Sequence, residues 1–318
     1  MHKPSWYSDG QVLVVNAKTC GINKDGHEQY IVNPETGIRS NETINDQLAE
    51  ACDEISKGSF SRDDVSFRSQ SEIFMLDVFV PKYYDASVYK GINSLVEDNG
   101  EFTLKTLGEL VEEGKIYVFG GHGSPSSDQR VGTIPYIKVS DLRAGLVNIN
   151  PTNMIPEALA KVFWRGGESK LKPYDLISPE RASKNIGEFC VLMPGQERVV
   201  LTKEVIIVRA CEGTAIDQFY LMWALSLKEV REQWERIIFM QTNREDVGKR
   251  VLEISIPYPN DKIVAAKYAE PFKKYFESLE AARKIFMKSL DQSSFNHFIH
   301  WGEMEVEPKE NAESGEEG

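Results

Sequence analysis

The sequence lacks any long apolar run. No stretch of its 318 residues approaches the ~18 consecutive apolar residues that a membrane-spanning helix needs. The first ten residues are polar, with no apolar segment behind a positive start, so we expect no secretory signal. With 41% hydrophobic and 27% charged residues, the chain is typical of a globular protein of roughly two domains. We therefore expect a cytoplasmic protein without a membrane partner.

Cysteine and histidine are both scarce and scattered. The four cysteines form no Cys-x-x-Cys pair; they are Cys20, Cys52, Cys190 and Cys211. Of the five histidines, His297 and His300 are three residues apart but lack the glutamate and the third ligand of a metalloprotease helix. We expect reduced thiols, no disulfide and no metal site.

Recognisable catalytic motifs are nearly absent as well. The sequence contains neither the phosphate-binding Gly-x-x-x-x-Gly-Lys-Ser/Thr loop nor Gly-x-Ser-x-Gly, and it shows no convincing nuclease cluster. Residues Phe119–Gly123 do fit F-x-G-x-G, the loop that approaches S-adenosylmethionine in Rossmann methyltransferases. Such a loop must open directly into a helix, whereas Ser124–Ser127 is typical of a continuing loop. We expect no catalytic residue and no cofactor, and S-adenosylmethionine binding at Gly120–Gly123 stays as the alternative.

The negative charge is unevenly distributed. The net charge is −12, and residues 1–120 carry 11 basic and 20 acidic groups. Residues 301–318 carry one basic and seven acidic groups, which leaves residues 121–300 with 25 basic and 22 acidic groups. Only this middle part can approach a polyanion without net repulsion, so charge alone permits nucleic-acid binding there and does not demand it.

Hydrophobic periodicity predicts a few elements clearly. Tyr30–Val32, between two turn-rich stretches, indicates a small hairpin, and Asn41–Ile55 is expected to be a helix capped by Asn41 or Thr43. Val205–Arg209 is apolar enough to be a strand buried on both faces. Phe219–Phe239 has the pattern of one long helix.

A second long helix is expected over residues 261–290. Its aromatic and apolar residues recur at a mean spacing of 3.5, the period that places a stripe against a partner helix. Pro271 is either a kink or the first residue of this helix. The candidate partner-docking residues are Tyr268, Phe272, Tyr275, Leu279 and Phe286. Packing against the helix's own domain is an equally open interpretation.

The central segment resembles a known family. Thr106–Leu110, the loop Gly120–Ser127 and the run Ile134–Leu142 resemble a target recognition domain from the specificity subunit of type I restriction–modification systems. The resemblance extends over about residues 104–290, and the run Ile-Pro-Tyr-Ile-Lys-Val-Ser-Asp-Leu is its most specific part. It implies a non-catalytic subunit that binds double-stranded DNA in a sequence-specific manner. It also implies an N6-adenine DNA methyltransferase as a partner, with a restriction subunit as a further one.

The N-terminal part carries a second resemblance. Ala17–Gly26 together with Asn45–Leu48 is similar to the C-terminal end of N6-adenine DNA methyltransferases. We therefore expect a mixed α+β protein: a small α/β appendage (residues 1–100), a recognition domain with a twisted β-sheet (101–260), a long coiled-coil-like helix (261–292) and an acidic, disordered tail (293–318). The main boundary is placed between residues 95 and 105. A split or degenerate methyltransferase fragment is the alternative function.

A recognition domain of this kind holds DNA phosphates with Lys and Arg and reads base edges with a few polar side chains. The residues that the resemblance selects lie in loops or flank its motifs. They are Ser124, Ser126, Gln129, Arg130, Lys138, Arg143, Arg165, Lys170, Lys172, Arg181, Lys184, Asn243 and Arg244. The sequence contains no second copy of the Ile134–Leu142 run, so one chain is expected to read one half-site unless two chains pair through the long helix.

Overall fold

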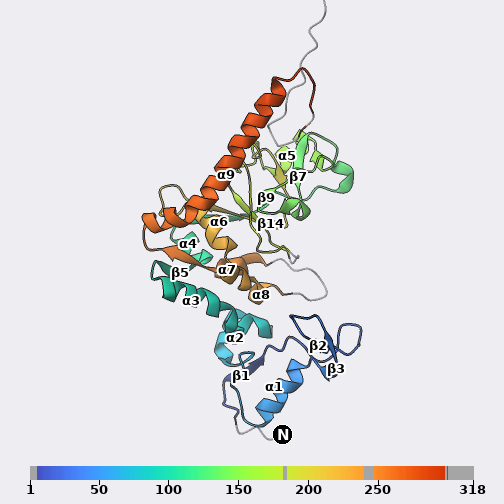
Figure 1. The fold of residues 1–318 in the computed structure, drawn as a ribbon, viewed down its shortest axis with the longest axis vertical. Helices are drawn as coiled ribbons and strands as arrows, with labels where there is room; N and C mark the ends of the chain where they lie inside the picture. The colour runs from blue at the N-terminus through green and yellow to red at the C-terminus, as the bar shows by residue number, and fades with distance from the viewer. Residues whose placement is uncertain (1–5, 182–184, 240–246, 298, 300–318) are drawn as a thin grey trace, which may run out of the picture. The chain divides into compact units, whose positions relative to one another are not determined.

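The computed structural model describes residues 6–181, 185–239, 247–297 and 299. The chain divides into two compact units, of which unit 1 comprises residues 1–91 with 235–237 and unit 2 comprises residues 92–234 with 238–318 (Figure 1). Both contain helices and strands, which confirms the expected α+β class. Among the described residues, no helix combines the length and the apolar character needed to cross a bilayer.

Unit 1 contains two small two-stranded sheets. Strand β1 (Gln11–Val15) pairs antiparallel with β4 (Val65–Ser69), and β2 (Tyr30–Val32) forms the expected hairpin with β3 (Arg39–Ile44). The helices are α1 (Gln47–Ser56) and α2 (Gln70–Leu76), followed by the 3-10 turns η1 (Pro81–Tyr84) and η2 (Ala86–Tyr89). Helix α3 (Lys90–Asn99) leads into unit 2.

The first helix starts later than the sequence pattern predicted. Asn41 and Thr43 lie in strand β3, and Asp46 is the residue that caps α1, by accepting the Ala49 backbone N–H at 2.9 Å. The predicted start was therefore wrong, because pairing with β2 holds Arg39–Ile44 extended. Ser69 caps α2 in the same way, through the Glu72 N–H at 3.1 Å.

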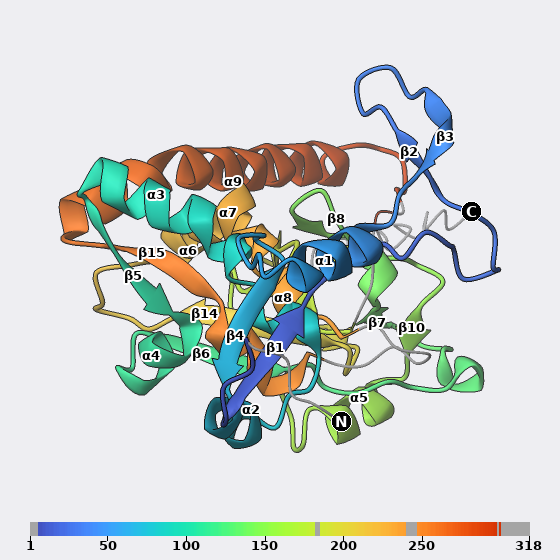
Figure 2. The ribbon, with the colours of Figure 1, turned by 90° about the horizontal axis from the view of Figure 1, so that it is seen from below.

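Unit 2 is organised around two sheets. The larger has the strand order β6-β14-β11-β12-β9-β8 and the smaller has the order β10-β7-β13. Figure 2 shows β6 beside β14 and β7 beside β10. The strands are β6 (Ile116–Gly120), β7 (Ile134–Ile137), β8 (Leu142–Arg143), β9 (Leu146–Val147), β10 (Met154–Ile155), β11 (Leu176–Pro179), β12 (Cys190–Val191), β13 (Val200–Leu201) and β14 (Val205–Ala210). A separate antiparallel pair joins β5 (Phe102–Thr106) to β15 (Ser255–Pro259).

The main core of unit 2 lies between these two sheets. Ile137 and Leu201 come from the smaller sheet, and Ile177 and Ile207 from the larger one, all at most 1% exposed. As expected, the residues of β14 from Val205 to Val208 are all buried. Short helices and 3-10 turns connect the strands: α4 (Leu107–Glu112), η3 (Ser127–Gln129), η4 (Val139–Asp141), α5 (Glu157–Phe163) and η5 (Gly248–Glu253).

The predicted long helix at Phe219–Phe239 is wrong. The segment forms three short helices, α6 (Gln218–Ser226), α7 (Lys228–Glu232) and α8 (Trp234–Ile237). Leu227 breaks the run, because its backbone is extended at φ −61° and ψ 137°. The buried side chain of Gln233 then binds both the N–H and the carbonyl of Ser255, each at 2.8 Å, which ties this corner to strand β15.

The long C-terminal helix α9 (Lys262–Asp291) is drawn in orange-red in Figure 1. Asp261 caps it by accepting the N–H groups of Ile263 and Val264. Pro271 lies inside the helix, so the alternative that made Pro271 its first residue is wrong. Ala265, Ala269 and Phe276 are buried, and the helix packs against α6.

Candidate nucleic-acid interface

Three loops of unit 2 meet beside the end of strand β6. They are residues 120–130 after β6, residues 163–171 after α5, and the turn 202–204 between β13 and β14. We call this the three-loop surface. The backbone N–H groups of His122 and Gly123 both donate to the Leu201 carbonyl, at 3.0 and 3.1 Å. The Ser124 hydroxyl lies 3.0 Å from that of Thr202, so the first and third loops are hydrogen-bonded side by side.

The glycines of the first loop are required by close packing. A Cβ at Gly121 would lie 1.9 Å from the Thr202 carbonyl oxygen, and a Cβ at Gly123 would lie 2.3 Å from the ring of Phe163. Contacts this short exclude any side chain without movement of the neighbours. The loop then continues through Ser124 and Pro125 to the 3-10 turn η3, not to an α-helix. The glycine pattern therefore serves contact between the three loops.

The ring of His122 connects the first loop to the second loop and to the end of strand β13, which leads into the third loop. Its Nδ1 accepts the Leu201 backbone N–H at 2.9 Å, and its Nε2 lies 2.8 Å from the Ser169 carbonyl oxygen. Since Nδ1 accepts, Nε2 carries the proton and donates it to Ser169. Burial lowers the pKa of the ring, against a smaller opposite effect of the Ser169 carbonyl. His122 is thus held neutral as a structural bridge.

Four cationic side chains on the three-loop surface have no ion-pair partner among the described residues: Arg130, Arg165, Lys170 and Lys203. Arg165, Lys170 and Lys203 are exposed. Arg130 is half-buried, with its guanidinium 5.3 Å from the centre of the Tyr136 ring and an N–H donated to the Pro125 carbonyl at 3.3 Å. Three cations therefore face solvent, and the fourth lies folded onto the protein.

The second loop has an unusual backbone. Arg165, Lys170 and Tyr174 have φ values of 55°, 60° and 66°, and Gly166 and Gly167 have positive φ as well. Left-handed backbone in a residue other than glycine costs on the order of 1 kcal/mol, so other contacts must hold it.

A buried ion pair supplies part of that support. Arg209 donates to both carboxylate oxygens of Asp175, at 2.6 and 2.5 Å, and Asp175 is fully buried. Arg209 also donates to the Lys170 carbonyl at 2.9 Å, and the Lys172 N–H donates to Asp175 at 2.9 Å. The pair thereby fixes the backbone that presents Lys170.

The polar side chains of the first loop that were predicted to contact DNA differ in how far they are already hydrogen-bonded within the protein. Ser124 is exposed, although its hydroxyl is engaged with Thr202. The side-chain oxygen of Gln129 accepts the Ser126 N–H at 3.1 Å, so this amide closes the η3 turn. Reading adenine uses both the oxygen and the nitrogen of an amide, and the oxygen of Gln129 is already engaged within the turn.

Other predicted cations lie beside the surface or elsewhere. Lys138 follows β7, directly beside Thr202, whose N–H donates to the Ile137 carbonyl at 2.9 Å. Arg143 lies on β8, the edge strand opposite β6 in the larger sheet, where its Nε–H donates to the Ser140 carbonyl at 2.8 Å. Lys172 pairs with Glu212 at 3.3 Å and Arg181 with Glu204 at 2.6 Å. Lys184, Asn243 and Arg244 lie outside the described residues.

Sequence reasoning missed Lys203. It lies in the three-residue turn between two buried strands, and its backbone N–H lies 3.4 Å from the Ser124 hydroxyl. The position was recoverable in principle, since Thr202–Glu204 separates two apolar runs that both read as strands. The pairing of β13 with β7 that brings this turn beside Lys138 could not be read from either run.

The candidate docking residues of α9 fall into two groups. Tyr268 stacks on Trp223 with ring centres 4.5 Å apart, and its hydroxyl donates to Glu101 at 2.7 Å. Phe272 and Leu279 are half-buried. Tyr275 and Phe286 are 55% and 44% exposed, so these two are the most accessible of the five candidates. The predicted tail from residue 300 onward lies outside the described residues.

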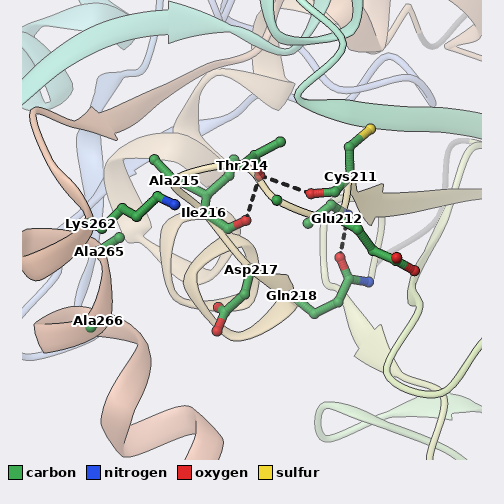
Figure 3. Close-up of a pocket in the computed structure, with 12 residues that line it drawn as sticks. Cys211, Glu212, Thr214, Ala215, Ile216, Asp217, Gln218, Lys262, Ala265 and Ala266 are labelled. Carbon is green, nitrogen blue, oxygen red and sulfur yellow. Dashed lines mark hydrogen bonds between the residues drawn. The ribbon is translucent and has the colours of Figure 1, made fainter.

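A hollow of about 390 Å³ lies between the β14–α6 loop and the first turns of α9 (Figure 3). The Thr214 hydroxyl is within 2.9 Å of the carbonyls of both Cys211 and Ile216, and Asp217 accepts the Tyr220 N–H at 2.8 Å. These polar groups are bonded within the loop, so the hollow does not present a converging set of ligand groups.

No family model matches the chain, and a search of the curated proteins returned no relative. Solved structures similar to it include the type IIG restriction endonuclease BpuSI, 12% identical with a TM-score of 0.43, over 71% of this chain and 33% of that one. The S subunit of a type I restriction–modification system from M. genitalium is 14% identical with a TM-score of 0.34, over 76% and 64%. The HsdS subunit from Thermoanaerobacter tengcongensis is 16% identical with a TM-score of 0.35, over 66% and 50%.

The chain thus spans less than two thirds of the length of each of these proteins. At such identities a likeness concerns the fold alone.

Proposed function

We propose that this chain is a sequence-specific DNA-recognition subunit of a type I-like restriction–modification system. It binds double-stranded DNA in the cytoplasm and directs a partner N6-adenine methyltransferase, and with it a restriction subunit, to a target. The chain itself makes and breaks no bond. Residues 101–260 form the recognition domain, 261–292 the docking helix, 1–100 an appendage and 293–318 an acidic tail.

One observation carries the proposal: three loops from distant parts of unit 2 are joined at a surface that presents Arg165, Lys170 and Lys203 to solvent without ion-pair partners among the described residues. Several other cations of the unit are held in ion pairs, among them Lys172 with Glu212 and Arg181 with Glu204. Unneutralised Lys and Arg on rigidly held loops are suited to phosphate oxygens, which position a protein on the duplex before any base is read.

On this surface, the side chains suited to phosphate contacts differ from those suited to base contacts. Arg165, Lys170 and Lys203 are exposed and suited to phosphates, with Lys138 beside them. Ser124 and Ser126 are exposed serines of the first loop, and the Ser124 hydroxyl would have to exchange its bond to Thr202 in order to contact a base edge. Arg130 would have to leave Tyr136 to reach DNA, so its present contacts favour a role in shaping the loop.

The experiment is a selection followed by a titration. The full chain is used to enrich duplexes of about 30 base pairs with a randomised centre. Fluorescence anisotropy then measures the Kd for the enriched motif and for a scrambled duplex, at several salt concentrations. We expect enrichment of one short motif and binding that weakens steeply with salt. No enrichment, or equal affinity for both duplexes, refutes the proposal.

A matched pair of triple variants locates the surface. The variant Arg165→Ala/Lys170→Ala/Lys203→Ala should weaken binding to both duplexes and reduce the salt slope by about 0.9 for each phosphate that is no longer neutralised. The control Lys228→Ala/Lys273→Ala/Lys274→Ala removes the same charge from α7 and α9 and should leave both unchanged. If the two variants had equal effects, the three-loop surface would not be the site that binds DNA.

Calorimetry with S-adenosylmethionine distinguishes this proposal from the alternative, a methyltransferase fragment. The proposal expects no heat of binding, because Gly121 and Gly123 are packed against Thr202 and Phe163. A saturable heat with wild-type protein would favour the fragment.

A further inference from the structure

Strand β1 in unit 1 has an edge without a partner among the described residues. The Asn16 N–H donates to the Asp64 carbonyl at 2.7 Å, and the Gln70 N–H donates to the Gly10 carbonyl at 2.8 Å. Residues 10 and 16 thus face β4. Because backbone groups alternate along a strand, Leu13 and Val15 point their N–H and C=O groups to the other side. Within the described part of the chain, neither residue has a backbone hydrogen bond on that side.

An apolar hollow lies along β1. Its volume is about 280 Å³, and it is formed by residues 12–15 together with Ile73, Phe74, Phe79 and Tyr84. Phe74 and Phe79 are 62% and 66% exposed, with ring centres 6.0 Å apart in an edge-to-face arrangement. Two aromatic rings this exposed, beside an open strand edge, make a surface that binds or aggregates unless it is covered.

The net charge of unit 1 indicates which kind of segment can cover the edge of β1 and its apolar hollow. Residues 6–91 carry eight basic and fourteen acidic side chains, a balance of −6. A second copy of unit 1 would bring the same negative charge, and residues 301–318 of this chain are acidic too. Both are therefore poor occupants, whereas a positively charged segment is attracted.

We propose that the edge of β1 binds an extended segment of a partner protein, in which apolar and basic residues alternate, as a third strand of the β1–β4 sheet. The segment's backbone pairs with Leu13 and Val15, its apolar side chains enter the hollow beside Phe74 and Phe79, and its basic side chains face the acidic unit. A two-stranded sheet is only marginally stable, so the added strand also stabilises β1 and β4. The inference is independent of DNA recognition by unit 2.

The probe is a fluorescein-labelled synthetic peptide, acetyl-Lys-Phe-Lys-Val-Lys-Phe-Lys-amide, titrated against the full chain. We expect saturable binding by anisotropy and slower hydrogen exchange at the amides of Leu13 and Val15. The same peptide with Glu in place of Lys, and a version with proline at its central residue, should bind at least about tenfold more weakly. Equal binding of the Glu peptide, or no protection within residues 11–15, overturns the proposal.

One surface variant, with a matched control, tests the site without disturbing the core, and a variant of the strand edge complements it. Phe79→Lys should weaken binding of the Lys peptide by about tenfold, since it removes an apolar contact and adds a like charge. Ile38→Lys makes the same change at a residue that is 69% exposed in the β2–β3 turn, and it should bind like wild type. Leu13→Pro removes an outward N–H and spares the bonds to β4. If that variant unfolds, Phe79→Lys still decides: wild-type affinity in it refutes the site.

Discussion

His122 and Leu201 are joined by two hydrogen bonds that run in opposite directions. The His122 backbone N–H donates to the Leu201 carbonyl at 3.0 Å, and the Leu201 N–H donates to the His122 ring at Nδ1, at 2.9 Å. Residues 79 positions apart are thereby held as closely as neighbours in a sheet. A third hydrogen bond of His122, from its ring Nε2 to the Ser169 carbonyl, joins this pair to the second loop of the three-loop surface.

The surface should consequently loosen in acid. Burial lowers the pKa of His122 in the folded state below its unfolded value of ~6.5, so the unfolded chain takes up a proton first as pH falls. The stability that neutral His122 contributes is present above pH ~6.5 and is lost as pH falls toward the folded pKa. One proton accounts for at most about 1.4 kcal/mol per pH unit. Urea unfolding from about pH 7.5 to about pH 5.5 should show a steeper loss for wild type than for His122→Gln, and parallel curves would contradict this.

The two loop glycines should differ in how their substitutions can be rescued. Gly123→Ala forces a methyl group against the Phe163 ring and should cost ~1–3 kcal/mol of unfolding free energy. The methyl group added by Gly121→Ala clashes with the backbone carbonyl of Thr202, which no substitution can make smaller. A double-mutant cycle with Phe163→Leu should therefore show favourable coupling for Gly123→Ala and none for Gly121→Ala. Equal coupling for both would mean that the loops are not packed as described.

Lys203 should contribute to DNA binding as a phosphate contact. Lys203→Ala is expected to weaken binding to the enriched and scrambled duplexes by the same factor and to lower the salt slope by about 0.9. Lys228→Ala, at an 84% exposed side chain on α7, is the matched control and should have no effect. Reduced affinity for the enriched duplex alone would instead make Lys203 a reader of bases.

The cysteines should react in a fixed order. Cys20 and Cys52 are exposed, and Cys211 is half-exposed at the hollow shown in Figure 3. Burial raises the pKa of Cys190 to about 12, so its thiolate is scarce at neutral pH. Labelling with a thiol reagent should modify Cys20 and Cys52 first, Cys211 more slowly and Cys190 only after unfolding. Rapid labelling of Cys190 in the native protein would contradict the packing of β12.

Two tyrosines of α9 should have different effects on stability. Tyr268→Phe removes the hydrogen bond to Glu101 and should cost about 1 kcal/mol, whereas Tyr275→Phe, at an exposed ring, should change the unfolding free energy by less than ~0.5 kcal/mol. Urea unfolding of both variants measures this. A larger loss for Tyr275→Phe would place that ring, and not Tyr268, against unit 2.

Local sequence patterns predicted the elements whose signal lies within a short stretch of the chain. The hairpin at Tyr30–Val32, the buried strand at Val205–Arg209 and the long C-terminal helix all follow from short-range periodicity. The helix at Phe219–Phe239 was wrong because α6 is buried on all sides, so its apolar residues mark burial and not a continuous helical face.

The candidate site was only partly predictable for a related reason. Arg165 and Lys170 could be selected because they lie in a loop-rich basic stretch, and the structure places both on the three-loop surface. Which cations are neutralised could not be read from the sequence, since the partners of Lys172 and Arg181 lie 40 and 23 residues away. The same holds for His122, whose three hydrogen bonds come from residues far along the chain.

The pairing of β5 with β15 has a consequence for how such a protein can change. Phe102 lies opposite Pro259 and Thr106 opposite Ser255, so the chain enters and leaves this part of unit 2 at adjacent points. The segment between them returns close to its starting point, and it also packs against the long helix α9 through α6. A different intervening segment would therefore fit this framework only if it kept both the strand pairing at its two ends and the face of α6 that supports the helix starting at residue 262.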